Sequence, residues 1–132
     1  MWNYEKRLQY PINITTPNAK IAQIIMSQYG GPDGEMGASM RYLSQRFTMP
    51  NRTAVAVLND VGTEELAHLE MVSTIVHQLT RGLSMEEIEK SGFGPYYIDH
   101  TVGVWPQAAG GVPFNACEFQ SKGDPVTDLF ED

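Results

Sequence analysis

The stretch DVGTEELAHLEMVSTIVHQL, residues 60–79, decides the fold class of this chain. It belongs to a longer pattern, from about Arg52 to Leu79, in which inward positions recur at alternating spacings of 3 and 4 residues. These positions are Val55, Leu58, Gly62, Glu65, Leu69, Val72, Val76 and Leu79. Such spacing is typical of a helix whose one face packs inside a bundle. We therefore expect a helix of about 28 residues, or roughly 40 Å.

A carboxylate interrupts the apolar face of this helix. Glu65 occupies an inward position, where an unpaired carboxylate is costly and is normally protonated or paired. His68 follows three residues later, about 60° around the helix, so both side chains can reach one point inside a bundle. Glu-x-x-His on an inward face is the ligand motif of di-iron and di-manganese carboxylate bundles. The pattern favours a metal-ligand pair, and the alternative is a solvated helix rim, which we expect for Glu64, Glu70 and His77.

Two shorter helical patterns precede the long one. Thr16-Pro17 is a typical helix start, and Gly30-Gly31 ends the first pattern. The apolar stripes of the two helices are Ile21, Ile24 and Ile25, and then Met36, Met40, Leu43 and Phe47. Glu35 stands in the first turn of the second helix, where an acid is commonly a partner of the helix dipole. A two-metal bundle also needs a Glu from a neighbouring helix, and Glu35 is the candidate.

The rest of the chain predicts a long connection and one more helix start. Residues 80–123 are rich in Gly and Pro, with a short helix signal at Ser84–Glu87 that fits a capping box. Asp124-Pro125 then begins another helix. Ferritin-like bundles use a long crossover, whereas up-down bundles use short loops. We expect an all-α, ferritin-like four-helix bundle in which residues 1–132, a single domain, hold the first half of the bundle.

The composition excludes several classes of function. The formal net charge is −7 and the pI is near 4.8, so no basic stripe is available to displace counterions from nucleic-acid phosphates. No window approaches about 18 consecutive apolar residues, and we expect no membrane span. Cys117 is the single cysteine, which excludes a disulfide within the chain and a thiolate cluster. The start MWNYEKRLQYP lacks the apolar segment of a secretory signal, so we expect a reducing, cytoplasmic compartment.

Two long motifs resemble those of a known family. YGGPDGEMGASMRYLSQRF (residues 29–47) and the stretch 60–79 are similar to the first two bundle helices of the non-haem manganese catalases. The resemblance extends to the shorter spore-coat branch of that family, called CotJC. The segments EKRLQYP (5–11) and PFNACEFQSKGDPVTDLFED (113–132) are also similar to that branch.

This resemblance implies a pair of manganese ions that disproportionates hydrogen peroxide to water and oxygen. It implies that Glu35 is a terminal ligand, that Glu65 is a bridging carboxylate and that His68 supplies an imidazole. Carboxylate oxygen and imidazole nitrogen suit manganese or iron, so iron is the alternative metal. In the family, a further Glu and a further His come from two helices beyond the long loop. This sequence reaches Asp132, just inside the first of those helices.

Two explanations fit this departure from the family pattern. The first is that the sequence is part of a longer chain. The second is that two copies pair by two-fold symmetry, and that each contributes Glu35 and the Glu65–His68 pair to a shared site. The family implies a homo-oligomer, namely a hexamer, and its spore-coat branch implies contacts with other coat proteins.

Three functions stay open at this point. They are peroxide disproportionation by a dimanganese site, a structural spore-coat role with the same fold but little activity, and a di-iron carboxylate chemistry. The fold does not choose among them, because one bundle hosts several chemistries. The expected location is the cytoplasm or the spore coat.

Overall fold

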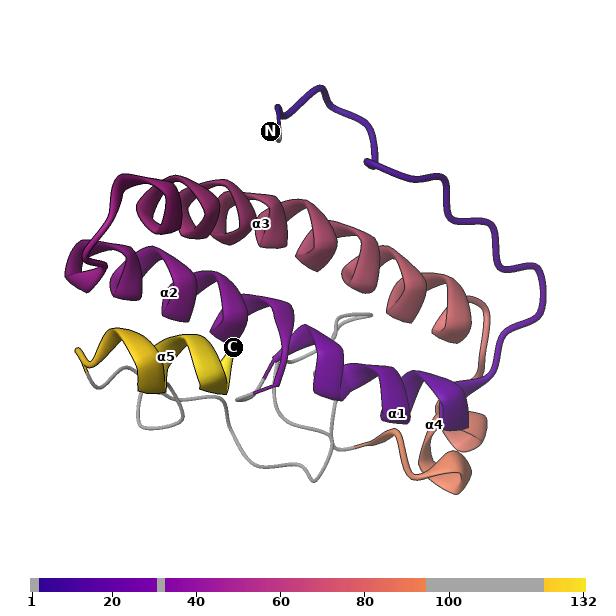
Figure 1. Cartoon of the computed structure of the whole chain (residues 1–132). Helices are drawn as coiled ribbons and strands as arrows, with labels where there is room; N and C mark the ends of the chain where they lie inside the picture. The colour runs from indigo at the N-terminus through magenta and orange to yellow at the C-terminus, as the bar shows by residue number, and fades with distance from the viewer. Residues whose placement is uncertain (1–2, 31–32, 95–122) are drawn as a thin grey trace.

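The computed structural model describes residues 3–30, 33–94 and 123–132, and these residues form helices and no strand. The elements are α1 (Ala19–Tyr29), α2 (Glu35–Gln45), the 3-10 turn η1 (Arg46–Thr48), α3 (Arg52–Thr80), α4 (Met85–Ser91) and α5 (Pro125–Glu131). In Figure 1, α2 lies beside the first half of α3 and α1 beside its second half. The prediction of an all-α fold is therefore confirmed for the described residues.

The long helix α3 forms as its sequence pattern predicts. Asn51 caps its first turn, where the side-chain oxygen accepts a hydrogen bond from the amide of Ala54 at 2.8 Å. The helix then continues without a break for 29 residues. Its buried residues are Leu58, Gly62, Glu65, Ala67, Val72, Val76, Leu79 and Thr80. Six of the eight predicted inward positions are thus buried, including the carboxylate at position 65, and the other two, Val55 and Leu69, are half-buried.

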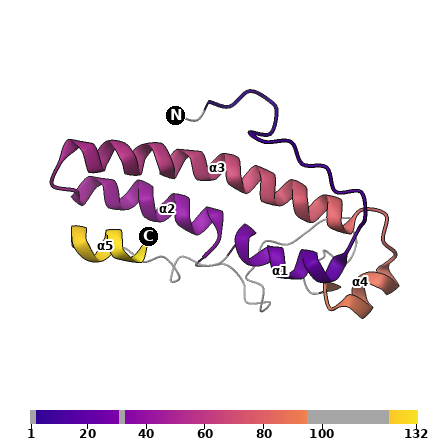
Figure 2. The ribbon, with the colours of Figure 1, turned by 45° about the vertical axis from the view of Figure 1, so that its right-hand side comes forward.

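Helices α2 and α3 approach each other closely at Gly62. A Cβ atom at this position would lie 2.9 Å from Leu43 Cγ and 3.0 Å from Tyr42 Cβ. The hydroxyl of Ser39 donates a hydrogen bond to the carbonyl oxygen of Gly62 at 2.7 Å. A glycine inside a helix costs about 1 kcal/mol relative to alanine. Here it permits the close contact that brings the two helices together (Figure 2).

The apolar core lies at the other end of α3. Its largest members are Met26 from α1, Val76 and Leu79 from α3, Ile88 from α4, and Phe93. Phe93, Met26 and Ile88 are among the largest fully buried side chains of the described residues. In this core, α1 and α4 therefore pack with the second half of α3.

The prediction for α1 was wrong in two details. The helix begins at Ala19, and its cap is Asn18, whose side chain accepts from the amide of Ile21, rather than Thr16. The predicted stripe also faces outward in part, because Ile21 and Ile24 are exposed and the small residues Ala19 and Ala22 are buried. In the second stripe, Met40 and Phe47 are likewise exposed. Arg46–Thr48 forms a 3-10 turn, so Phe47 no longer follows the period of α2.

The two short helices have the ends that the sequence predicts. Ser84 and Glu87 form a complete capping box at α4, and Gly92 ends that helix at a φ of 85°. Asp124 caps α5, and Pro125 occupies the first turn. Most of the predicted connection, including Cys117 and His100, lies outside the described residues. None of the described helices is long and apolar enough to cross a membrane.

The N-terminal arm, residues 3–18, is held along α3 in an extended form (Figures 1 and 2). The side chain of Gln78 accepts from the amide of Ile14 at 2.6 Å and donates to the carbonyl oxygen of Ile12 at 3.0 Å. Arg81 donates to the carbonyl oxygen of Ile14 at 2.8 Å. The backbone of the arm is thus held by side chains at the end of α3, and its sequence pattern did not predict these contacts.

Candidate metal centre

The three predicted ligands come together between α2 and α3. Glu35 is the first residue of α2, and Glu65 and His68 stand near the middle of α3. One ligand atom from each of these residues lies within 4.8 Å of the other two. The Nδ1 atom of His68 is 2.7 Å from Oε2 of Glu65 and 3.6 Å from Oε2 of Glu35. Among the described residues, this is the group of acids and histidines that is arranged to hold a metal ion.

Burial distinguishes the three side chains. Glu65 is the most buried, with 8% of its surface exposed. The side chains of Glu35 and His68 retain 22% and 35% exposure. The cluster therefore has a closed side at Glu65 and a more open side at His68.

The electrostatics of the cluster favour a cation. Burial, the hydrogen bond to Glu65 and the negative charge of Glu65 together raise the pKa of Glu35 to about 7, against the opposing effect of His68. Two carboxylates held together away from water resist being ionised at the same time. A divalent cation relieves this repulsion, and two carboxylate oxygens with one imidazole nitrogen suit manganese or iron. The residues thus fit the metal ion that the sequence predicts.

Tyr42 is a neighbour of this cluster that the sequence patterns did not reveal. Burial raises the pKa of the Tyr42 phenol, and so do the negative charges of Asp132 and Glu65. The side chain of Arg41 pairs with Asp132, with Nε 3.7 Å from Oδ1. Tyr42 is seven residues after Glu35, two helical turns on, and this spacing is the signal that would have placed it on the same face.

Glu64 lies on the partly exposed rim of α3, as predicted, but it also makes two contacts there. Its Oε1 atom lies 4.0 Å from Nε2 of His68. It also accepts a hydrogen bond from the side chain of Gln9, in the N-terminal arm, at 2.5 Å. His77, in contrast, is exposed as expected.

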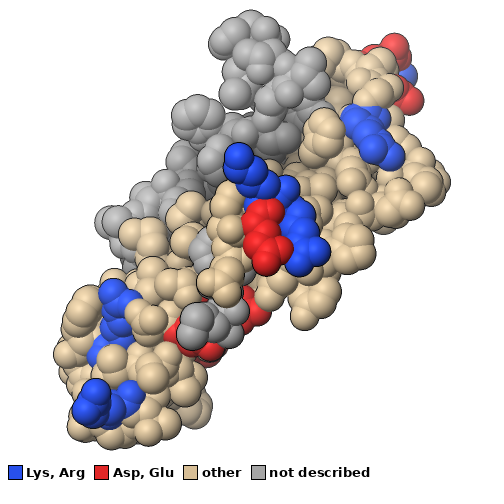
Figure 3. Space-filling model, turned by 90° about the horizontal axis from the view of Figure 1, so that it is seen from above, with Lys and Arg blue, Asp and Glu red and all other residues tan. Residues whose placement is uncertain are grey.

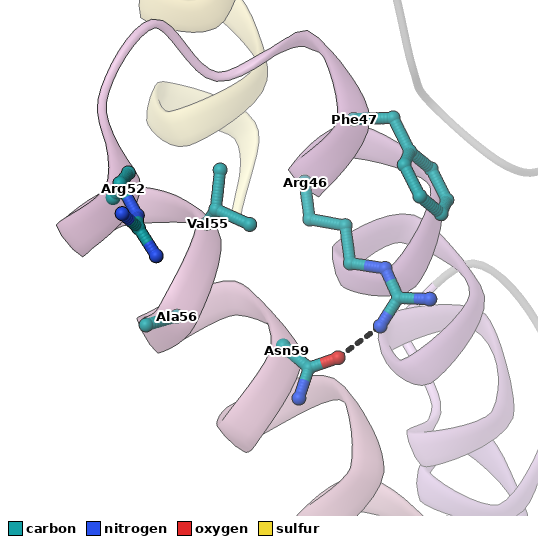
Figure 4. Close-up of a pocket in the computed structure, with 6 residues that line it drawn as sticks. All are labelled: Arg46, Phe47, Arg52, Val55, Ala56 and Asn59. Carbon is teal, nitrogen blue, oxygen red and sulfur yellow. Dashed lines mark hydrogen bonds between the residues drawn. The ribbon is translucent and has the colours of Figure 1, made fainter.

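An open pocket near the start of α3 is a separate feature (Figure 4). Its volume is about 430 Å³, and it is lined by Arg46, Phe47, Arg52, Val55, Ala56 and Asn59. Arg46 donates to the side-chain oxygen of Asn59, and its guanidinium lies 4.7 Å from the centre of the Phe47 ring. No acid or histidine lines this pocket. It therefore offers no carboxylate or imidazole side chain to a metal ion.

The surface charge agrees with the composition. On the face that Figure 3 shows, the Lys and Arg side chains of the described residues form small separate groups, with acidic side chains among them. A continuous basic stripe is the electrostatic footprint of a nucleic-acid interface, and this face does not carry one.

Comparison with known proteins places the chain in a family. The sequence model of the family described as manganese containing catalase matches residues 1–132. The chain belongs to the manganese catalase family. It is 47% identical to Protein CotJC of Bacillus subtilis over its whole length, and it covers 69% of that protein. It is 28% identical to a manganese catalase of Bacillus subtilis, with 98% of this chain and 52% of the relative aligned.

A solved structure gives the same result. The crystal structure of KatB, a manganese catalase from Anabaena, superimposes with a TM-score of 0.81 at 27% identity. The superposition covers 99% of this chain and 58% of that one. The predictions of the family, of its CotJC-like branch and of a ferritin-like helical fold are therefore confirmed. The chain spans about half the length of the manganese catalases that it matches, and about two thirds of CotJC.

Proposed function

We propose that Glu35, Glu65 and His68 are ligands of a dimanganese centre, and that the protein disproportionates hydrogen peroxide to water and oxygen. One observation carries this proposal: the ligand atoms of these residues lie within 4.8 Å of one another in a chain of the manganese catalase family. A manganese pair would supply the two-electron chemistry that converts two peroxide molecules into two water molecules and one oxygen molecule.

Each of the three side chains would have its own role at the metal centre. Glu65 supplies a buried negative charge, which only a cation or a proton can balance. His68 directs its Nδ1 atom toward both carboxylates and leaves the cluster open on its own side. Glu35, whose pKa is about 7 in the metal-free protein, can hold a proton on its carboxyl until a cation takes its place.

Three donors do not complete the coordination of two metal ions. We propose that further donors come from additional chain or from a second copy in a homo-oligomer. We also propose that residues 1–132 act as one ferritin-like domain. Two contacts support this: α2 packs on one half of α3, and the shared apolar core fastens α1 and α4 to the other.

Metal analysis of the purified protein tests the ligand assignment. We expect manganese in the wild-type protein and its loss in Glu65→Ala, because the buried ligand is then absent. Glu70→Ala, which removes the same charge from the same helix, is the control and should retain manganese. Undiminished manganese in Glu65→Ala would remove this residue from the site, and iron in place of manganese would favour a di-iron protein.

Oxygen release on addition of peroxide tests the activity. We expect the wild-type protein to release oxygen and Glu65→Ala to release none. The identity with CotJC favours a second function, which is a structural role in the spore coat with contacts to other coat proteins. A protein that retains manganese but releases no oxygen, and that is found in the coat fraction of spores, would establish that second function.

A further inference from the structure

The outer nitrogen of His68 faces a carboxylate that does not belong to the cluster. Nδ1 of the ring points to Glu65 and Glu35, at 2.7 and 3.6 Å. Nε2, on the opposite edge of the ring, lies 4.0 Å from Oε1 of Glu64, one turn earlier on α3. The imidazole therefore stands between two ligand carboxylates on one side and Glu64 on the other.

Glu64 is itself held in place from the N-terminal arm. The side-chain amide of Gln9 donates a hydrogen bond of 2.5 Å to the Oε1 atom that faces His68. The arm is anchored further along α3, where Gln78 and Arg81 bond to its backbone at Ile12 and Ile14. A continuous chain of contacts thus leads from the arm through Glu64 to the open side of the metal centre.

A histidine that binds a metal through one ring nitrogen usually donates its other N–H to a carboxylate or carbonyl. That second contact fixes the tautomer and the orientation of the ring, and it makes the ligand nitrogen more basic. Nε2 and Oε1 are 4.0 Å apart here, which is longer than a hydrogen bond. We propose that Glu64 moves within hydrogen-bond distance of Nε2 when a metal binds and then acts as a positioning residue for His68, and that Gln9 holds Glu64 for this role. The proposal rests on the proposed function, in which His68 binds the metal through Nδ1.

A different role for Glu64 makes a different prediction. If Glu64 forms only an exposed ion pair, it acts on a nearby cation through space, so Glu64→Ala and Glu64→Gln would weaken Mn²⁺ binding equally. The positioning role instead predicts that Glu64→Ala weakens Mn²⁺ binding more than Glu64→Gln does, in a protein that remains folded. The two roles are separated by measuring metal affinity and stability on the same variants.

The experiment is a titration of the metal-free protein with Mn²⁺, in which electron paramagnetic resonance reports the free ion. We expect Glu64→Ala to bind Mn²⁺ about 10- to 100-fold more weakly than the wild type. Glu64→Gln keeps an acceptor oxygen without the charge, so its affinity should be intermediate. Glu70→Ala is the matched control for the loss of one negative charge on α3, and its affinity should stay within about twofold of the wild type.

A spectroscopic readout separates positioning from a general loss of structure. With Zn²⁺ as a diamagnetic substitute and ¹⁵N-labelled histidine, the Nε2–H proton of His68 should exchange slowly with water in the wild type. In Glu64→Ala this signal should be lost, and in Gln9→Ala it should weaken, while circular dichroism stays unchanged. Glu64→Gln serves in place of Glu64→Ala if the latter does not fold.

The outcomes distinguish this inference from the proposed function. If the wild-type protein binds no Mn²⁺, the metal centre itself is wrong and the role of Glu64 falls with it. If the wild type binds Mn²⁺ and Glu64→Ala binds it as tightly as Glu70→Ala, the metal centre stands and the positioning role of Glu64 is refuted. A slowly exchanging Nε2–H in Glu64→Ala would refute it in the same way.

Discussion

The two halves of α3 are packed in opposite ways. The second half meets α1 and α4 through apolar side chains, of which Val76 and Leu79 are buried. The first half meets α2 through Gly62 and through buried polar groups, among them Ser39 and Glu65. In the second half of this helix, the burial of apolar side chains stabilises the fold. In the first half, the burial of a carboxylate opposes folding. The comparison shows that the apolar core lies at one end of α3, whereas the candidate metal centre lies near the middle of the same helix.

Removal of Phe93 should give the largest loss of stability. This side chain is fully buried in the apolar core, so Phe93→Ala should lower the free energy of unfolding by about 3–5 kcal/mol. Denaturant unfolding of the metal-free protein measures this loss, and the exposed Val126→Ala serves as the control. If the two regions are separate, the Mn²⁺ affinity of the folded variant is unchanged at low temperature. A weaker Mn²⁺ affinity in Phe93→Ala would show that the apolar core and the metal-binding cluster are coupled.

A side chain at Gly62 should disturb the polar half instead. Gly62→Val places atoms against Leu43 and Tyr42, which a Cβ atom alone approaches to 2.9 and 3.0 Å. We expect it to destabilise the protein by about 1–3 kcal/mol and to weaken Mn²⁺ binding as well, because α2 must move away with Glu35. Ala56→Val, at an exposed position of α3, controls for the helix propensity of valine. Unchanged metal affinity in Gly62→Val would show that the helix contact does not set the geometry of the cluster.

The pH dependence of stability should give the smallest effect. The pKa of Glu35 rises from 4.5 to about 7 on folding without metal. Between these values the folded protein holds a proton that the unfolded chain has released, so the free energy of unfolding falls as the pH rises through this window. The loss should be on the order of 1 kcal/mol after allowance for solvent screening. Glu35→Gln should abolish it, and a slope that persists in this variant would assign it to another group.

The parts that the sequence predicted are those that depend on a long, regular pattern. The period of α3 extends over the whole helix, so both its bounds and the inward position of Glu65 followed from the spacing. Helix α1 is short, and there the contact with α3 decided which side faced inward, so Ala19 and Ala22 are buried in place of Ile21 and Ile24. Local propensity is a weak guide where tertiary packing overrides it.

For the candidate site too, the sequence predicted the contacts that lie within one helix better than those between distant segments. Glu65 and His68 share one helix, so their spacing alone placed them together, and Glu35 was found because a bundle site needs an acid from a neighbouring helix. The contact between Glu64 and Gln9 joins residues 55 positions apart. It depends on how the arm folds back over α3, and no spacing within a helix carries that information.

The close contact at Gly62 has a consequence for the candidate metal centre. Glu65 and His68 are carried by one helix, whereas Glu35 begins the helix that packs against Gly62. The position of Glu35 relative to the other two candidate donors therefore depends on how closely α2 and α3 approach each other. A missing side chain on one helix thus sets how near an acid on the other can come.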